Sequence, residues 1–356
     1  MNADSTIQSE ALLEEKKKLG VKCVVWDLDD TLWNGTLLEG GVKGLQTEVL
    51  EVIRALDGRG ILQSIASKNE HAPALAQLEA LGIAEYFLYP QINWGPKSAS
   101  IERIAKDLNI GIDTLAFIDD QTFELDEVRF ALPQVMCIPA TEIGAVLARS
   151  EFIPRFITED SGRRRAMYMA DITRNKVGEH FNGPQDAFLA SLDMRLCIAA
   201  ARADDLKRAE ELTLRTNQLN TTGYTYSYEE LERFSRSNQH RLLIAGLDDK
   251  YGTYGKIGLV LIEVENDAWM VKLLLMSCRV MTRGVGTVLI NHIRNQARLR
   301  GVRLLAEMLP NERNRMMYMT YKFNYFREVD KRGDLVIFEN NLEPVHAHPA
   351  YMKLEI

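Results

Sequence analysis

The sequence predicts two folded parts, an α/β domain built on a parallel sheet and then an α+β domain. The chain has 356 residues, which corresponds to two domains at about 150 residues per domain. From Val21 to about Ser150, strand-like apolar runs alternate with helix-like segments, as in βαβ units. After Pro184 several strand-like runs follow one another with few helices between them. This change of pattern predicts a second, separate fold.

The expected organisation has four segments. Residues 1–20 form an N-terminal extension, 21–150 the α/β domain, 151–185 a helical linker and 186–356 the α+β domain. The linker is rich in charge and has no strand pattern. No internal repeat or low-complexity tract is evident in the sequence.

The first domain is expected to alternate strands and helices, because short apolar runs bounded by turn residues favour buried strands. Its strands are predicted at Val21–Leu28, Ile61–Ser67, Tyr86–Tyr89, Thr114–Asp119 and Gln134–Ile138. Its helices are predicted at Gln46–Gly60, Glu70–Gly82, Pro96–Leu108 and Phe123–Ala131. The alternation predicts a parallel sheet.

The second domain is expected to contain an antiparallel hairpin, because two apolar runs are separated only by Asn266 and Asp267. Its strands are predicted at Asp193–Ala200, Arg241–Leu247, Lys256–Glu265 and Ala268–Met276, and its helices at Asp204–Gln218 and Gly284–Arg300. Short α and β pieces are expected to close the chain.

The composition disfavours nucleic-acid-binding, disulfide-rich and membrane proteins. The net charge is −7 and the basic runs Lys16–Lys18 and Arg163–Arg165 are short, which disfavours nucleic-acid binding. The four cysteines follow no CxxC or disulfide-rich spacing, which favours a reduced cytosolic interior. No apolar run reaches the ~18 residues of a membrane span, and the polar N-terminus is unlike a signal peptide. We expect a soluble cytoplasmic protein without nucleic-acid or membrane partners.

Candidate catalytic residues are concentrated where the first predicted strand ends. The β-branched run before Trp26 is followed by Asp27, Asp29 and Thr31. In an extended strand this spacing points both carboxylates to one face, which suits a nucleophile beside a proton donor at the edge where open α/β sheets bind ligands. An Asp-rich turn that merely ends a strand is the alternative.

Polar groups at later strand ends and helix starts extend this pattern in chain order: Ser67, Lys97, Asp119 and Asp120. Phosphoryl transfer requires an in-line nucleophile and neutralisation of the phosphoryl charge. Asp27 is expected to attack phosphorus and Asp29 to serve as general acid and base. Ser67 and Lys97 are expected to bind phosphate, and the acidic pair to complete a Mg²⁺ site. Taken singly, these residues also fit a helix N-cap, a solvated lysine and a turn.

The order of these motifs resembles the haloacid dehalogenase superfamily of aspartate-nucleophile phosphatases. The resemblance implies a Rossmann-like parallel sheet and a metal held by Asp27, the backbone carbonyl of Asp29, and Asp120 or Asp119. Asn69, which follows Ser67, is assigned to phosphate binding with it. Only a loop and one helix are predicted between Thr31 and Ser67. The site is therefore expected to be uncapped and open to a bulky substrate.

Longer phrases narrow the resemblance: WDLDDTLWNGTLLE, ASKNE, FIDD, TNQLNTTG and LMSCRV. Together they resemble the FkbH-like proteins of polyketide (antibiotic) biosynthesis, over about Lys22 to Phe326. The resemblance implies dephosphorylation of 1,3-bisphosphoglycerate and transfer of its glyceryl group to the phosphopantetheine thiol of an acyl carrier protein. There are two alternatives. One is a phosphatase whose second domain docks a partner, and the other is a CoA-dependent N-acyltransferase.

Cys278 matches the cysteine of the SCRV phrase and is expected to accept the acyl group, with Arg279 beside it favouring the thiolate. A buried structural cysteine is the alternative. The other cysteines, Cys23, Cys137 and Cys197, lie in apolar strand patterns and are expected in the core.

The C-terminal half also resembles the Gcn5-related N-acetyltransferase fold, in which a glycine-rich turn opening a helix binds a pyrophosphate. Arg283, Gly284 and Gly286 provide such a turn, but Met281 replaces the usual Gln or Arg, so the turn is expected to receive the carrier's pantetheine arm or to be only a turn. The polar residues Thr216, Asn217, Gln218 and Asn220 fit either the glyceryl site or a helix cap and loop. His180 and His292 are expected on the linker surface and on a helix face.

Overall fold

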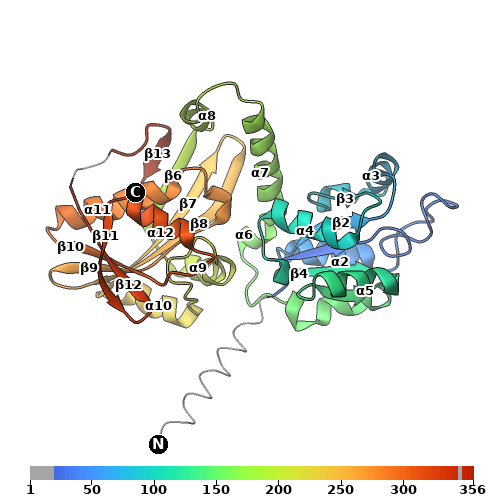
Figure 1. Ribbon diagram of the computed structural model, residues 1–356, viewed down its shortest axis with the longest axis horizontal. Helices are drawn as coiled ribbons and strands as arrows, with labels where there is room; N and C mark the ends of the chain where they lie inside the picture. The colour runs from blue at the N-terminus through green and yellow to red at the C-terminus, as the bar shows by residue number, and fades with distance from the viewer. Residues whose placement is uncertain (1–19, 344–346) are drawn as a thin grey trace, which may run out of the picture. The chain divides into compact units, whose positions relative to one another are not determined.

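The computed structural model describes residues 20–343 and 347–356. The chain divides into two compact units, Met1–Met169 and Ala170–Ile356 (Figure 1). The division falls inside helix α7 (Arg164–Glu179), within the segment expected to link the two domains. The expected N-terminal extension, 1–20, lies outside the described residues except for its last residue.

The first unit contains a five-stranded parallel sheet with the order β3-β2-β1-β4-β5. Its strands are β1 (Cys23–Trp26), β2 (Leu62–Ser67), β3 (Gln91–Ile92), β4 (Leu115–Asp119) and β5 (Met136–Pro139). The predicted α/β fold with a parallel sheet is therefore confirmed. Since β1 pairs with β2 on one side and β4 on the other, the segments that follow these strands emerge at one edge of the sheet.

The helices of this unit are α2 (Val49–Gly58), α3 (His71–Ala80), α4 (Lys97–Leu108), α5 (Thr122–Ala131) and α6 (Glu159–Gly162). Its core joins one sheet face to α2 and α3. Val24 and Trp26 of β1 are fully buried there with Ile53 of α2 and Leu78 of α3. The short 3-10 helices are Ala84–Tyr86, Ile112–Thr114, Ala140–Ala148 and Ser150–Phe152.

Two predicted strands of this unit differ from the structure. Tyr86–Tyr89 is not a strand, because Tyr89 has a left-handed backbone with φ of 51°; only Phe87 forms a single bridge, to Gln63. The first strand ends at Trp26 and not at Leu28, because the carbonyl of Leu28 accepts turn hydrogen bonds from the following residues. Asp29 therefore lies in a turn beyond the strand.

The second unit contains an eight-stranded mixed sheet with the order β11-β12-β10-β9-β8-β7-β6-β13. The strands are β6 (Met194–Ala200), β7 (His240–Asp249), β8 (Gly252–Val264), β9 (Ala268–Met276), β10 (Arg303–Met308), β11 (Phe326–Arg332), β12 (Leu335–Asn340) and β13 (Met352–Glu355). Strands β6 to β9 are antiparallel, whereas β9 and β10 are parallel and are connected through helix α11 (Val285–Leu299). The predicted α+β class and the hairpin are confirmed.

Both faces of this sheet are covered by helices (Figure 1). Helices α11 and α12 (Arg315–Phe323) pack on one face, and α9 (Ala203–Arg215) and α10 (Tyr228–Arg236) on the other. Helix α10 was not predicted, although Ser227 and Glu230 form a capping box at its start. Helix α8 (Gln185–Ser191) directly precedes β6.

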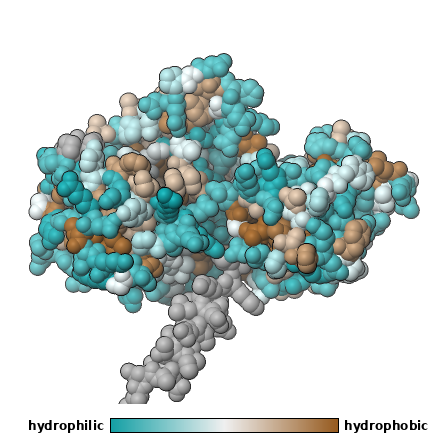
Figure 2. Space-filling model, viewed as in Figure 1, coloured by the Kyte–Doolittle hydropathy of each residue, from teal (hydrophilic) through white to brown (hydrophobic). Residues whose placement is uncertain are grey.

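The face of the molecule in Figure 2 is mostly hydrophilic, and its hydrophobic side chains form small, separate patches. Among the described residues, no helix combines the length and apolarity that a membrane crossing requires.

Candidate phosphoryl-transfer site

Asp27 lies directly after the central strand and is 4% exposed. Its backbone N–H donates to the carbonyl of Ile118, which holds it against β4. Ser67 ends β2, Asp119 ends β4 and Lys97 opens α4. Parallel pairing therefore brings together the residues that the sequence placed at separate strand ends.

Lys97 joins the two buried aspartates. Its ammonium lies 2.7 Å from a carboxylate oxygen of Asp27 and 2.5 Å from one of Asp119. The side chains of all three residues are at most 6% exposed. Ser67 donates a further side-chain hydrogen bond to Asp27. The predicted nucleophile is thus fixed from two sides.

The electrostatics of this cluster favour an additional cation. Burial raises the pKa of Asp27 to about 6 although Lys97 opposes the shift. Burial also raises the pKa values of Asp119 and Asp120. Burial alone would lower the pKa of Lys97, but Asp27 and Asp119 raise it above its ordinary value. The carboxylates therefore carry more negative charge than Lys97 offsets.

Asp27, Asp119 and Asp120 each offer a carboxylate oxygen, and these oxygens all lie within 4.8 Å of one another. Asp120 is exposed, and Thr31 orients it by donating its hydroxyl at 3.3 Å and accepting the Asp120 N–H at 2.9 Å. Three carboxylates share the one charge of Lys97, so the donor set fits a hard divalent cation. Asp29 was predicted to bind the metal through its backbone carbonyl and contributes no carboxylate oxygen to this cluster.

Asp29 is held by a different set of donors. Its Oδ1 accepts hydrogen bonds from the indole of Trp33 at 2.8 Å and from the N–H of Leu37 at 3.0 Å. Its Oδ2 accepts one from Asn69 at 3.0 Å. Asn69, predicted to bind phosphate, thus orients Asp29 in this structure. The three donors fix the carboxylate that was assigned to acid and base catalysis.

Sequence reasoning missed two supporting residues. Trp33 is one α-turn beyond Asp29 and its role depends on the turn at Leu28, which no spacing rule revealed. Glu124 is almost fully buried and pairs with Lys68 at 2.6 Å, next to Ser67. A buried glutamate in the first turn of α5, just after the acidic pair, was the available signal.

In the second unit Cys278 is half-buried and begins a short 3-10 helix, Cys278–Val280, after β9. The Arg279 guanidinium contacts groups other than the Cys278 thiol. It donates to the carbonyl of Tyr254 at 2.7 Å and lies 3.8 Å from Asp171. Part of the positive charge of Arg279 is therefore offset by Asp171.

Two of the other three cysteines differ from the expected core position. Cys23 is buried and burial raises its pKa well above the ordinary value, but Cys137 is only half-buried. Cys197 is exposed, so its prediction was wrong. Strand β6 alternates inward and outward side chains, and Met194 and Leu196 take the inward positions.

The TNQLNTTG phrase forms a hydrogen-bonded loop between two strands. Leu219 accepts from the N–H of Met276 and Thr221 donates to Leu274, both on β9. On the other side Thr221 accepts from the N–H of Leu309, just after β10. The buried Asn220 caps this loop by accepting from the backbone at Thr222 and Gly223. These contacts match the cap-and-loop alternative.

Gly284, just before α11, and Gly286, in its first turn, each lie against another side chain that leaves no room for a Cβ. Gly284 has φ of 76°, and a Cβ there would lie 2.3 Å from the hydroxyl of Tyr351. A Cβ on Gly286 would lie 2.9 Å from Met276. Both glycines allow close packing at this turn.

The two histidines take the expected places. His180 is exposed and its ring bonds the carbonyl of Lys176 at 2.7 Å. His292 is buried on α11, where burial and His348 lower its pKa.

No family model matches the chain, and no match was found among curated proteins. Among solved structures, the N-terminal part of the protein BF1531 from Bacteroides fragilis, which contains a phosphatase domain complexed with Mg, is 28% identical with a TM-score of 0.33. That match covers 45% of this chain and 41% of the other, so the chain spans less than half of that relative.

Acetyltransferases provide further similar structures. The GNAT domain of S. lividans PAT is 21% identical with a TM-score of 0.32, and the match covers 40% of this chain and 88% of that chain. The ribosomal-protein-S18-alanine N-acetyltransferase from Escherichia coli is 16% identical with a TM-score of 0.33, over 43% and 96% of the two chains.

Proposed function

We propose that the first unit is a Mg²⁺-dependent phosphatase with Asp27 as nucleophile. The observation that carries this proposal is the buried contact of Lys97 with both Asp27 and Asp119, beside the exposed carboxylate of Asp120. Asp27, Asp119 and Asp120 would hold the metal, which supplies charge neutralisation for the phosphoryl oxygens. Ser67 and Lys97 would bind those oxygens as the substrate enters.

The chain's own residues account for the chemical steps. A carboxylate oxygen of Asp27 forms a bond to phosphorus while the bond from phosphorus to the leaving oxygen breaks. Asp29 gives a proton to that leaving oxygen. Asp29 then takes a proton from water, whose oxygen attacks the phosphorus and releases Asp27 with inorganic phosphate. Trp33 and Asn69 keep the Asp29 carboxylate oriented during both steps.

We further propose that the whole chain loads a glyceryl group onto an acyl carrier protein, with 1,3-bisphosphoglycerate as donor. An acyl phosphate is an activated acyl group, so the thiolate of Cys278 would displace the C1 phosphate and form a thioester. The carrier's phosphopantetheine thiol would then take the acyl group and release Cys278. The C3 phosphate ester is the bond left for Asp27. Arg279, Arg283, Gly284 and Gly286 are the residues proposed to meet the carrier arm.

The test is to incubate the chain with 1,3-bisphosphoglycerate, Mg²⁺ and a holo carrier protein, and to weigh the intact carrier by mass spectrometry. A glyceryl adduct is expected with the wild type and with Cys197→Ala, whose thiol is exposed on β6. Cys278→Ala should give none. Absence of an adduct with the wild type contradicts the loading function, and loading by Cys278→Ala contradicts the covalent role of that thiol.

A phosphatase whose second unit only docks a partner is the second candidate. The engagement of Arg279 with Asp171 and Tyr254 favours it, because that cation is then less able to stabilise a thiolate at Cys278. This candidate predicts phosphate release from a phosphoester that is unaffected by Cys278→Ala. The carrier-loading assay separates the two functions, because only the loading function predicts a glyceryl adduct on the carrier.

A further inference from the structure

Helix α12 exposes a row of apolar side chains to solvent. Its core-facing side chains are Met317 and Tyr321, which are at most 1% exposed. Met316, Met319 and Phe323 point away from the core and are 52%, 36% and 75% exposed. Spacings of three and four residues place these three side chains next to one another on the helix. Apolar side chains gathered on one exposed surface mark a place where another molecule binds.

Two cations border this row. Arg315 and Lys322 are exposed, and within the described residues neither forms an ion pair. Between residues 311 and 323 there are three basic residues and one acidic residue, Glu312. By contrast, the exposed Arg298 of α11 pairs with Glu343 at 2.9 Å. We call the exposed side of this helix the α12 face, and it consists of Arg315, Met316, Met319, Lys322 and Phe323.

The α12 face lies beside the turn at the start of α11. A Cβ on Gly286 would lie 3.4 Å from Cγ2 of Thr320, so the two helices are in contact there. Thr320 is four residues after Met316 and three before Phe323, which places it along one edge of the apolar row. Met319 is on the other edge, and the two cations are four residues before it and three residues after it. The apolar row therefore separates the α11 turn from the two cations.

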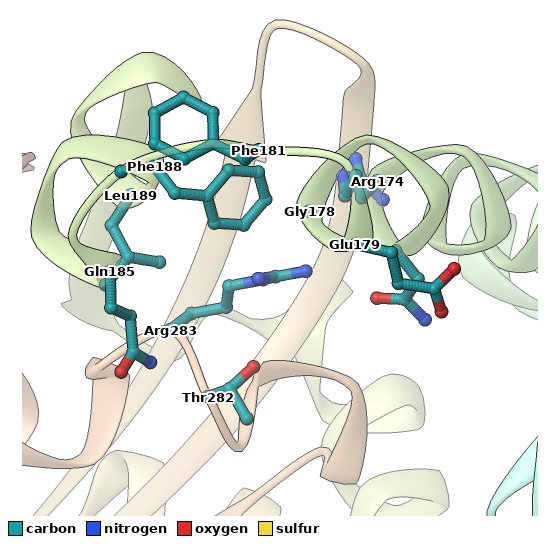
Figure 3. A pocket seen from close by; sticks show the side chains of 11 residues that line it. Arg174, Gly178, Glu179, Phe181, Gln185, Phe188, Leu189, Thr282 and Arg283 are labelled. Carbon is teal, nitrogen blue, oxygen red and sulfur yellow. The ribbon is translucent and has the colours of Figure 1, made fainter.

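The second unit also has a pocket of about 500 Å³ whose lining includes Arg174 and Arg283 (Figure 3). Carboxylates already offset the charge of these arginines. Asp249 accepts two hydrogen bonds of 2.7 and 2.8 Å from Arg174. Asp171 interacts electrostatically with both Arg174 and Arg283. The cations of the α12 face are therefore more available to an acidic partner than those at the pocket.

We propose that the α12 face docks an acidic surface of the carrier protein. Acidic side chains of the carrier would pair with Arg315 and Lys322, while apolar ones would cover the row beside them. The chain has a net charge of −7, so most of its surface repels an acidic protein and a local basic patch directs that protein to one place. A carrier docked there lies beside the α11 turn. The inference rests on the proposed loading function, which supplies the carrier as the partner.

Isothermal titration of the full chain with the apo and the holo form of the carrier used for loading measures the docking. The apo carrier has no phosphopantetheine arm, so its binding reports the protein surface alone. Arg315→Glu combined with Lys322→Glu should weaken the binding of both forms by about tenfold or more and reduce its dependence on salt. Met316→Ser combined with Phe323→Ser should also weaken binding, but the salt dependence should remain.

Arg298→Glu combined with Arg303→Glu is the matched control, since these exposed arginines of the same unit pair with Glu343 and Glu339. The control makes the same change in net charge and should bind the carrier as the wild type does. Thermal unfolding of the α12-face variants should match that of the wild type, because the four replaced side chains are exposed. Equal losses of binding in the two charge variants would reflect net charge alone and would overturn the proposal.

The same measurements separate the docking surface from the loading function. If the variant with Arg315→Glu and Lys322→Glu binds and loads the carrier as the wild type does, the docking surface is wrong and loading stands. If the wild type binds the carrier through the α12 face but forms no glyceryl adduct, docking is supported and loading is contradicted. Binding to vesicles of anionic phospholipid, lost in that variant and absent with the carrier, would assign the α12 face to a membrane surface and overturn the proposal.

Discussion

The ammonium of Lys97 lies 2.7 Å from a carboxylate oxygen of Asp27, and both side chains are almost completely buried. This contact ties the start of α4 to the end of the central strand, across 70 residues of sequence. It gives the predicted nucleophile a fixed position and a compensating charge. Its removal should therefore affect both stability and phosphoryl chemistry.

Lys97→Met should destabilise the first unit by about 3–5 kcal/mol, because it leaves Asp27 and Asp119 buried without their cation. Phosphatase activity should be lost with it. Arg103→Met is the matched control on the same helix, since Arg103 is exposed and its pair with Asp107 is worth about 1 kcal/mol or less. Urea denaturation measures both variants. Equal stability of the two would contradict the structural importance of the buried pair.

Asp29→Asn should slow hydrolysis by about 10²–10⁴-fold for alkyl phosphates, whose leaving oxygen needs a proton. The loss should be much smaller with p-nitrophenyl phosphate, because p-nitrophenolate leaves without one. Asp27→Asn should abolish both activities. Parallel rate measurements with the two substrates distinguish the roles, and an equal loss on both would exclude general-acid catalysis by Asp29.

Asp120→Asn should weaken Mg²⁺ binding, because Asp120 is the exposed carboxylate of the three-member cluster. Isothermal titration with Mg²⁺ measures this directly, without a substrate. Asp126→Asn is the control, since Asp126 is exposed on α5 and pairs only on the surface with Arg129. Unchanged affinity in Asp120→Asn, or an equal decrease in both variants, would remove Asp120 from the metal site.

The positions of these acidic residues were predictable because parallel strands bring their carboxyl ends to one edge, so Asp27, Ser67 and Asp119 had to be neighbours. The turn beyond Trp26 could not be predicted from the sequence, because it depends on hydrogen bonds to the carbonyl of Leu28. The contact of Trp33 with Asp29 was therefore missed. The outward position of Cys197 could have been predicted, because side chains along a strand such as β6 alternate between its two faces.

His292 should make the second unit less stable as the pH falls below 6.5, the ordinary pKa of histidine. Burial lowers the pKa of His292 in the folded state, so the unfolded chain binds the proton first and is favoured. His292→Gln should therefore reduce the dependence of the unfolding free energy on pH in this range. The exposed His180, replaced by Gln, should not. An identical pH dependence in all three proteins would contradict the lowered pKa.

Gly284→Ala should destabilise the second unit for two separable reasons. Its φ of 76° costs an alanine about 1 kcal/mol, and the added Cβ would also meet the Tyr351 hydroxyl at 2.3 Å. Gly301→Ala isolates the first cost, because Gly301 has φ of 66° and nothing within 4 Å of an added Cβ. In a Tyr351→Phe background, Gly284→Ala should cost about as much as Gly301→Ala, since the clashing oxygen is gone. Denaturation of the four variants tests this, and an undiminished cost in the Phe background would mean that the hydroxyl of Tyr351 is not what excludes a side chain at the start of α11.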